Sequence, residues 1–176
     1  MWRRTSRWAC DSNPRPCPES QIRPRSTSAT HFRADGRWRL YAFADADGSA
    51  VADRASWLED SEDSPVNLFS PENTDIVSVF DAKVIYQQSY HDIDLAKVPR
   101  LFLPKVGHLQ IIDWEKVYST IEDDDIFDNR SVDRSGALVI VRPDMYVAHI
   151  LPLSARAELT ECFAQSMVRE KVLTMA

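Results

Sequence analysis

The most restrictive feature of this chain is the stretch GALVIVRPDMYVAHILPL, residues 136–153. Residues 137–141 are apolar at every position, which is typical of a central strand covered on both faces of a sheet. Pro143 and Asp144 predict a turn, because proline fixes φ and aspartate favours turn positions. With a return strand expected over residues 146–150, the stretch predicts a β-hairpin inside a covered sheet.

A last helix is predicted after this hairpin. Pro152 ends the return strand, and Ser154 is expected to cap the helix. Four apolar residues recur at helical spacing and form one stripe: Leu159, Cys162, Phe163 and Met167. We expect this stripe to pack on the sheet.

The region before the hairpin predicts a strand, a helix and a second strand. Residues 37–44 alternate in polarity along a strand. Arg37, Arg39, Tyr41 and Phe43 point to one face of it, and Trp38, Leu40, Ala42 and Ala44 point to the other. A helix capped by Ser49 follows, with Val51, Ala55 and Leu58 on one side, and residues 80–87 form the second, parallel strand.

The segments between these elements are less regular. Pro99 and Pro104 break residues 90–107 into a loop with one helical turn, residues 108–114 offer a short strand, and the acidic residues 119–136 are a surface connection. The order is therefore β-α-β, then a β-hairpin, then α. This predicts an α/β, thioredoxin-like fold, with a central mixed β-sheet and helices on its faces.

Residues 1–30 differ from the remainder in composition. They hold six arginines against Asp11 and Glu19, so they carry +4, and residues 31–176 carry −10 of the total net charge of −6. Rich in Arg, Pro and Ser and without apolar periodicity, they are expected to form a disordered leader before a domain at residues 31–176. The acidic body argues against a nucleic-acid partner, which needs a basic face.

Neither a membrane span nor a secretory signal is predicted. No run of eighteen apolar residues occurs, and no apolar segment follows the first arginines. The expected location is the cytoplasm. Cys10, Cys17 and Cys162 are then ordinary thiols, because their spacing fits neither a zinc site nor a disulfide framework.

Redox chemistry would need a C-x-x-C pair at the start of the first helix, where a helix N-terminus lowers the pKa of a thiol. The sequence there is ADADGSAV, residues 44–51, without a cysteine. The chain has four glycines, and none forms a nucleotide-binding motif. Catalytic and cofactor-binding residues are therefore predicted to be none.

Metal-binding residues are also predicted to be none. The histidines lack the spacing of metal ligands: His31, His91, His108 and His149. The acidic residues 122–125 lack the pattern of a calcium loop and are expected to form a solvated turn. Arg142 and Asp144 are interpreted as a strand-end charge and a turn residue, with a polar clasp across an interface as the alternative.

Three stretches carry a resemblance to a known family: HFRADGRWRLYAFAD, FLPKVGHLQIIDWEKVYS and, most specifically, GALVIVRPDMYVAHILPL. From about His31 onward the chain resembles the C-terminal domain of phenol 2-monooxygenase-like flavoprotein hydroxylases, a group that includes 3-hydroxybenzoate 4-monooxygenases. The resemblance implies a thioredoxin-like domain that contributes to dimerisation. It also implies a parent enzyme that uses FAD, NADPH and oxygen to hydroxylate a phenolic ring. Ser131 departs from the family, which more often has glycine there.

The hypothesis is then a detached or truncated dimerisation domain that is not catalytic alone and forms a homodimer. A separately encoded flavin domain as partner remains an alternative. A small thioredoxin-like ligand-binding or redox-sensing protein, resting on Cys162, is the alternative from another functional class.

Overall fold

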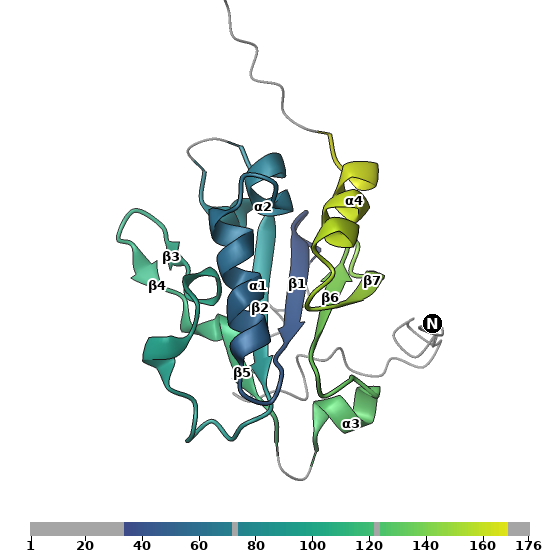
Figure 1. Ribbon diagram of the computed structural model, residues 1–176. Coiled ribbons are helices and arrows are strands. Elements are labelled where there is room, and N and C mark those ends of the chain that lie inside the picture. Colours follow the sequence, from purple (N-terminus) through teal and green to yellow (C-terminus); the bar gives the residue numbers. More distant parts are fainter. Residues whose placement is uncertain (1–33, 72–73, 122–123, 169–176) are drawn as a thin grey trace, which may run out of the picture.

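The computed structural model describes residues 34–71, 74–121 and 124–168 (Figure 1). Its main sheet has five strands in the order β5-β2-β1-β6-β7. The strands are β1 Trp38–Phe43, β2 Phe80–Tyr86, β5 Val117–Ser119, β6 Ala137–Val141 and β7 Val147–Pro152. β1 and β5 run parallel to β2, whereas β6 is antiparallel to both β1 and β7. This confirms the predicted thioredoxin-like order, with β5 added beside β2. The proposed leader, residues 1–30, lies outside the described residues.

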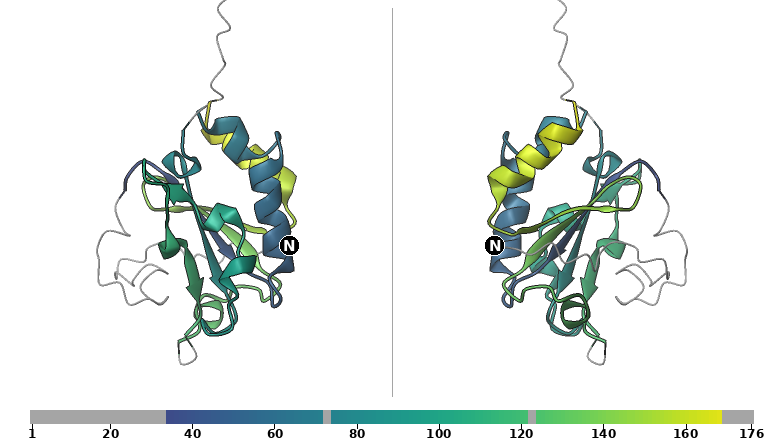
Figure 2. Two further views of the ribbon diagram at one scale, coloured as in Figure 1. Left: turned by 90° about the vertical axis from the view of Figure 1, so that its left-hand side faces the viewer. Right: turned by 90° about the vertical axis from the view of Figure 1, so that its right-hand side faces the viewer.

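Helices cover one face of this sheet. The α-helices are α1 Ser49–Asp60, α2 Pro65–Phe69, α3 Ile126–Arg130 and α4 Arg156–Ser166. Short 3₁₀ turns lie at Ile76–Ser78, Leu95–Lys97, Arg100–Phe102 and Trp114–Lys116. α1, α2 and α4 lie together on one side of the sheet, and α3 lies at the end where β1 and β2 finish (Figures 1 and 2).

Burial on both faces explains the apolar pattern of the central strands. Leu40 and Ala42 of β1 belong to the core beneath the helices, and Tyr41 and Phe43 belong to a second cluster on the opposite face. β6 is buried at all five positions, as its uniform apolar sequence predicted. The predicted stripe of α4 is also confirmed, because Leu159, Cys162 and Phe163 are buried and Met167 packs against them.

The caps of α1 and α4 differ from the prediction. Ser49 is the first residue of α1 rather than its cap, and the helix begins after Gly48. Asp45 instead accepts hydrogen bonds from the backbone N–H groups of Ala50 and Val51, each at 3.1 Å. A carboxylate reaches these exposed amides from the preceding turn, so the serine is not needed there. The predicted Ser154 cap of α4 is wrong as well: Ala155 stands at that position and makes no side-chain cap.

The return strand of the hairpin starts one residue later than predicted, at Val147. Met145 adopts φ 71° after the Pro143 turn, and its N–H donates to the Arg142 carbonyl at 2.9 Å. The register also shifts between Ile140 and Val141, which is a β-bulge. The extra residue lies near the turn, and the strand continues to Pro152, two residues beyond the predicted end.

Four helices and strands lie where none was predicted: α2, β3 (Lys105–Val106), β5 and α3. The predicted short strand at residues 108–114 is present as β4, Ile111–Ile112, but it does not join the main sheet. It pairs with β3 in a separate two-stranded sheet. A two-residue strand gives too little periodicity to reveal its partner from sequence.

Candidate interaction surface

A small hairpin projects from the side of the domain. This hairpin arm, residues 104–114, contains β3 and β4, with Val106 opposite Ile111. Gly107 at φ 68° and Gln110 at φ 50° make the tight turn, in which the Gln110 N–H donates to the Gly107 carbonyl at 3.1 Å. The Asp113 N–H donates to the Pro104 carbonyl at 2.9 Å and closes the base. The arm is therefore a defined structure that stands away from the core.

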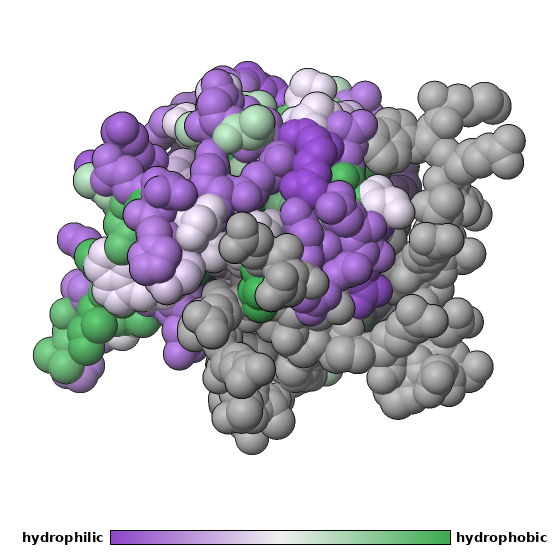
Figure 3. All heavy atoms as spheres, turned by 90° about the horizontal axis from the view of Figure 1, so that it is seen from below, coloured by the Kyte–Doolittle hydropathy of each residue, from purple (hydrophilic) through white to green (hydrophobic). Residues whose placement is uncertain are grey.

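Large apolar side chains of the arm are exposed to solvent. Leu109 is 68% exposed, Ile111 60% and Trp114 53%. Figure 3 shows hydrophobic side chains gathered on the projecting left edge, where Figure 1 places β3 and β4. Contiguous exposed apolar surface of this kind marks interaction sites more often than it occurs by chance on a monomer.

The charge around the arm distinguishes it from the remainder of the acidic body. Residues 95–112 contain no Asp or Glu, although the chain has 27 of them. The other large exposed apolar residues stand singly, and two of them follow a carboxylate in the sequence: Ile76 follows Asp75 and Leu95 follows Asp94. Two copies of an acidic domain repel each other least through a surface without carboxylates. The arm is thus the best candidate for association between copies.

A buried charge network anchors the base of this arm. Asp81 on β2 is 2% exposed, and its carboxylate accepts a hydrogen bond from Lys116 Nζ at 2.6 Å. Lys83 and Arg39 each place a cationic nitrogen 3.8 Å from the same carboxylate. Burial opposes ionisation of Asp81, but the charges of Lys83 and Lys116 outweigh it and hold the pKa of Asp81 below its ordinary value. Sequence reasoning missed this network.

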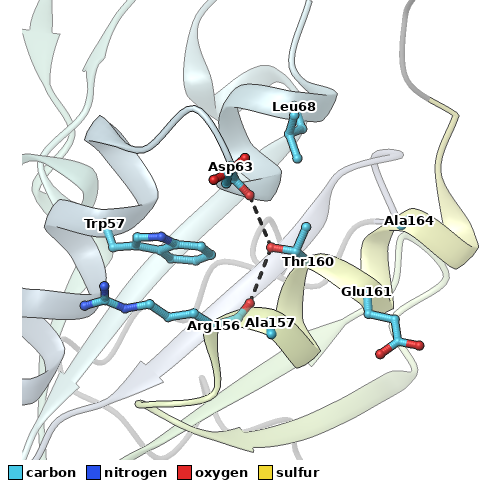
Figure 4. Close-up of a pocket in the computed structure, with 8 residues that line it drawn as sticks. All are labelled: Trp57, Asp63, Leu68, Arg156, Ala157, Thr160, Glu161 and Ala164. Carbon is cyan, nitrogen blue, oxygen red and sulfur yellow. Dashed lines mark hydrogen bonds between the residues drawn. The ribbon is translucent and has the colours of Figure 1, made fainter.

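A groove between α1, α2 and α4 is the second surface feature (Figure 4). Its volume is about 500 Å³, and its lining residues are Trp57, Asp63, Leu68, Arg156, Ala157, Thr160, Glu161 and Ala164. The Thr160 hydroxyl donates to the Asp63 carbonyl at 3.2 Å and joins the two walls. Sequence analysis did not single out any of these residues as a site.

The connection between β1 and α1 does not suit a dinucleotide such as FAD. In a dinucleotide site, free backbone N–H groups at a helix N-terminus bind the pyrophosphate. Here the Asp45 carboxylate already accepts from the N–H groups of Ala50 and Val51, and it would repel a phosphate. No step of flavin chemistry is therefore assigned to the described residues.

In a redox-active thioredoxin-like domain, the reactive thiol lies at the start of the first helix, which corresponds to the start of α1 here. Among the described residues Cys162 is the free cysteine, and it lies on the buried face of α4. Burial raises the pKa of the Cys162 thiol. Cys10 and Cys17 lie outside the described residues.

The structure does not bring together the histidines and acidic residues that the sequence analysis considered as metal ligands. His91, His108 and His149 lie on separate elements, and His31 is outside the described residues. Within the described ranges, no group of three His, Cys, Asp or Glu side chains could hold a metal ion. Asp125, from the acidic turn, instead caps α3 by accepting from the Phe127 N–H at 2.8 Å; residues 122–123 are not described.

Arg142 and Asp144 form an ion pair with each other at 2.5 Å across the hairpin turn. Asp144 also accepts a hydrogen bond from the Tyr146 N–H at 3.3 Å. Both contacts are local to the turn, which favours the structural interpretation of these residues over an interfacial clasp.

The family of the chain follows from sequence comparison. Residues 24–171 match the family described as phenol hydroxylase, C-terminal dimerisation domain. The chain belongs to this family. 3-Hydroxybenzoate 4-monooxygenase of Comamonas testosteroni is 44% identical over an alignment of 144 positions, and the match covers 77% of this chain and 22% of that protein. The FAD-dependent monooxygenase terD of Aspergillus terreus is 26% identical over an alignment of 149 positions, and the match covers 78% of this chain and 24% of that protein.

This dimerisation domain thus spans about a quarter of the length of the curated relatives it matches. Among solved structures, the thioredoxin domain of a thiol-disulfide oxidoreductase from Bacteroides vulgatus superposes with a TM-score of 0.48 and 10% identity, covering 77% of this chain and 82% of that one. The fold assignment rests on the strand order itself. In the described part of the chain, no helix has the length and apolar character needed to cross a bilayer.

Proposed function

We propose that this chain is a self-associating, non-catalytic domain that serves an FAD-dependent aromatic hydroxylase. Membership of the dimerisation-domain family supports self-association, and the names of two relatives describe monooxygenases, one of them FAD-dependent. FAD and NADPH are then requirements of the whole hydroxylase. The cytoplasm remains the predicted location.

The observation that carries the proposal is the hairpin arm. Leu109 and Ile111 expose apolar surface within a stretch without carboxylates, and Trp114 exposes more of it next to Asp113. Burial of such side chains against a second copy is favourable by roughly 25 cal/mol per Å² of apolar area. We therefore assign self-association to the arm.

Light scattering on a size-exclusion column tests this function directly. The expected species has twice the 20.1 kDa mass of the chain, and its fraction rises with protein concentration. A single monomeric species throughout the micromolar range would contradict self-association.

A second candidate is association with a separately encoded flavin domain. The same exposed arm favours it, since apolar surface does not specify whether the partner is identical. Pull-down of a flavin-containing hydroxylase by the monomeric chain, with a gain in NADPH oxidation on mixing, would favour this candidate over the homodimer.

The redox-sensing alternative receives less support. A sensing thiol needs a low pKa and access to solvent. Cys162 is buried, and burial raises the pKa of its thiol. Titration with a thiol reagent is expected to modify Cys162 slowly in the folded protein.

A further inference from the structure

A buried arginine lies against the Trp57 ring, which lines the groove. Arg54 on α1 is 1% exposed, and its Nε donates to the Leu153 carbonyl at 2.5 Å. Its two terminal nitrogens are also buried and have no hydrogen-bond acceptor within the part of the chain that the structure describes. A guanidinium remains charged in proteins, and buried donors without an acceptor are costly, so this group favours a nearby anion.

A second guanidinium shares the same aromatic ring. Arg54 Cζ lies 5.2 Å from the centroid of the Trp57 ring, and Arg156 Cζ lies 5.7 Å from it. Burial, followed by the positive charge of Arg156, lowers the pKa of Arg54 to about 10. Asp53 accepts a hydrogen bond from Arg156 Nη2 at 2.6 Å on the solvent side. Two positive charges therefore meet at this end of the groove, with Asp53 and Glu158 as partial counter-charges and Asp63 on the groove wall.

The groove also has an apolar wall, and its two ends carry opposite charges. Leu68, Ala157 and Ala164 line it together with the Trp57 indole. In Figure 4 the Arg156 side chain extends toward Trp57, whereas Glu161 lies at the opposite end. A volume of about 500 Å³ is ample for a small organic molecule. A negatively charged ligand would be attracted to the arginines at the Trp57 end of the groove and repelled by Glu161 at the other end.

We propose that this groove binds a small aromatic carboxylate, with its ring against Trp57 and its carboxylate on Arg156, while the buried charge of Arg54 adds to the positive potential at that end. Guanidinium groups recognise carboxylates through paired, charge-assisted hydrogen bonds. An aromatic body can use the indole face and the alanine and leucine wall, which a bare anion cannot. A multiply charged phosphate fits less well, because Asp53 and Glu161 lie close to the same groove. This site is independent of the hairpin arm.

Isothermal titration calorimetry of the whole chain with benzoate tests the proposal. Saturable binding to one site is expected. Benzyl alcohol, which keeps the ring without the charge, and acetate, which keeps the charge without the ring, should each bind at least about tenfold more weakly. Equal binding of benzyl alcohol and benzoate would overturn the role of the guanidinium groups. Equal binding of acetate would overturn the role of the aromatic wall.

Two exposed substitutions sharpen the test without disturbing the core. Arg156→Ala removes the 44% exposed guanidinium and should weaken benzoate binding roughly tenfold. Asp53→Asn releases Arg156 from its ion pair and should strengthen binding about threefold. Affinity that is unchanged in both variants would refute the site. Arg142→Ala, which removes another exposed, ion-paired arginine that does not line the groove, is the matched control and should bind as the wild type does.

Discussion

The Asp81 carboxylate accepts a hydrogen bond from Lys116 Nζ at 2.6 Å and so ties strand β2 to the segment that follows the hairpin arm. Lys116 also lies 3.3 Å from Asp113, at the base of the arm. The arm is thus anchored by charge at a point where both Asp81 and Lys116 are buried. A surface proposed for association needs such a fixed position, because a mobile arm would lose more entropy on binding.

Asp81→Asn is predicted to destabilise the domain by roughly 3 kcal/mol, because it leaves buried lysines without their counter-charge. Chemical denaturation monitored by circular dichroism measures the difference. Asp53→Asn is the matched control: its pair with Arg156 is exposed, so its effect on unfolding should stay below about 1 kcal/mol. Equal losses in the two variants would contradict a special role for the buried pair.

Acid should weaken the same network. The pKa of Asp81 is lower in the folded protein than in the unfolded chain, so its stabilisation is present above the ordinary aspartate pKa of 3.8 and is lost as pH falls through the folded value. Asp35 behaves alike: burial opposes its ionisation, but hydrogen bonds from Arg37 lower its pKa to about 2. Unfolding free energies measured between pH 6 and about pH 2 should therefore fall below pH 4. The difference between wild type and Asp81→Asn should shrink over the same range.

The central strands and α1 were predictable because the spacing of their apolar residues in the sequence matches the faces that are buried in the structure. The uniform apolar run of β6 requires cover on both faces, and Val51, Ala55 and Leu58 of α1 repeat at helical spacing, so both gave a clear signal. α2 had a readable signal that was not used. Ser64 caps it by accepting from the Asn67 N–H at 3.2 Å, and Pro65 follows at the first helical position.

The buried charges were not predictable in the same way. Asp81 and Lys116 are 35 residues apart and meet only because β2 pairs with β5, a strand of three residues. The strand pattern placed Arg39 on the face of Tyr41 but could not show that this face is buried. Arg54 gave a partial signal, since it falls three residues after Val51 on the apolar side of α1. The groove depends on how α4 docks, which no local pattern contains.

Gly136→Ala is predicted to destabilise the domain by roughly 2–4 kcal/mol. Gly136 has φ 92°, and an added Cβ would lie 2.9 Å from the Phe43 carbonyl oxygen and 2.5 Å from a Leu153 methyl carbon. Backbone cannot move aside cheaply at the start of β6. Gly107→Ala is the control, because its φ is also positive, at 68°, but nothing lies within 4 Å of the added carbon. It should cost only about 1 kcal/mol by thermal or chemical denaturation, and a cost as large as that of Gly136→Ala would contradict the packing argument.

Ser131→Gly is predicted to stabilise the domain by about 0.5–1 kcal/mol. Ser131 ends α3 in the left-handed region, at φ 53° and ψ 43°, where glycine avoids the steric cost of a side chain. The gain is reduced by the larger conformational entropy of glycine in the unfolded chain. Ser135→Gly, at a position without a positive φ, should instead be neutral or destabilising. Paired melting curves for the two variants decide the question, and a lower melting temperature for Ser131→Gly would count against strain at this cap.

The double substitution Leu109→Asp with Ile111→Asp is predicted to convert the dimer into a monomer. It removes two exposed apolar side chains from the arm and adds two negative charges to each copy, so a symmetric contact would lose burial and gain repulsion. A loss of at least about 100-fold in dimer affinity is expected from analytical ultracentrifugation. The melting temperature of the monomer should change little, because neither side chain packs in the core. Tyr90→Asp introduces a charge at another exposed residue, outside the arm, and should leave the dimer intact. A dimer that survives the arm substitutions but dissociates with Tyr90→Asp would place the interface elsewhere.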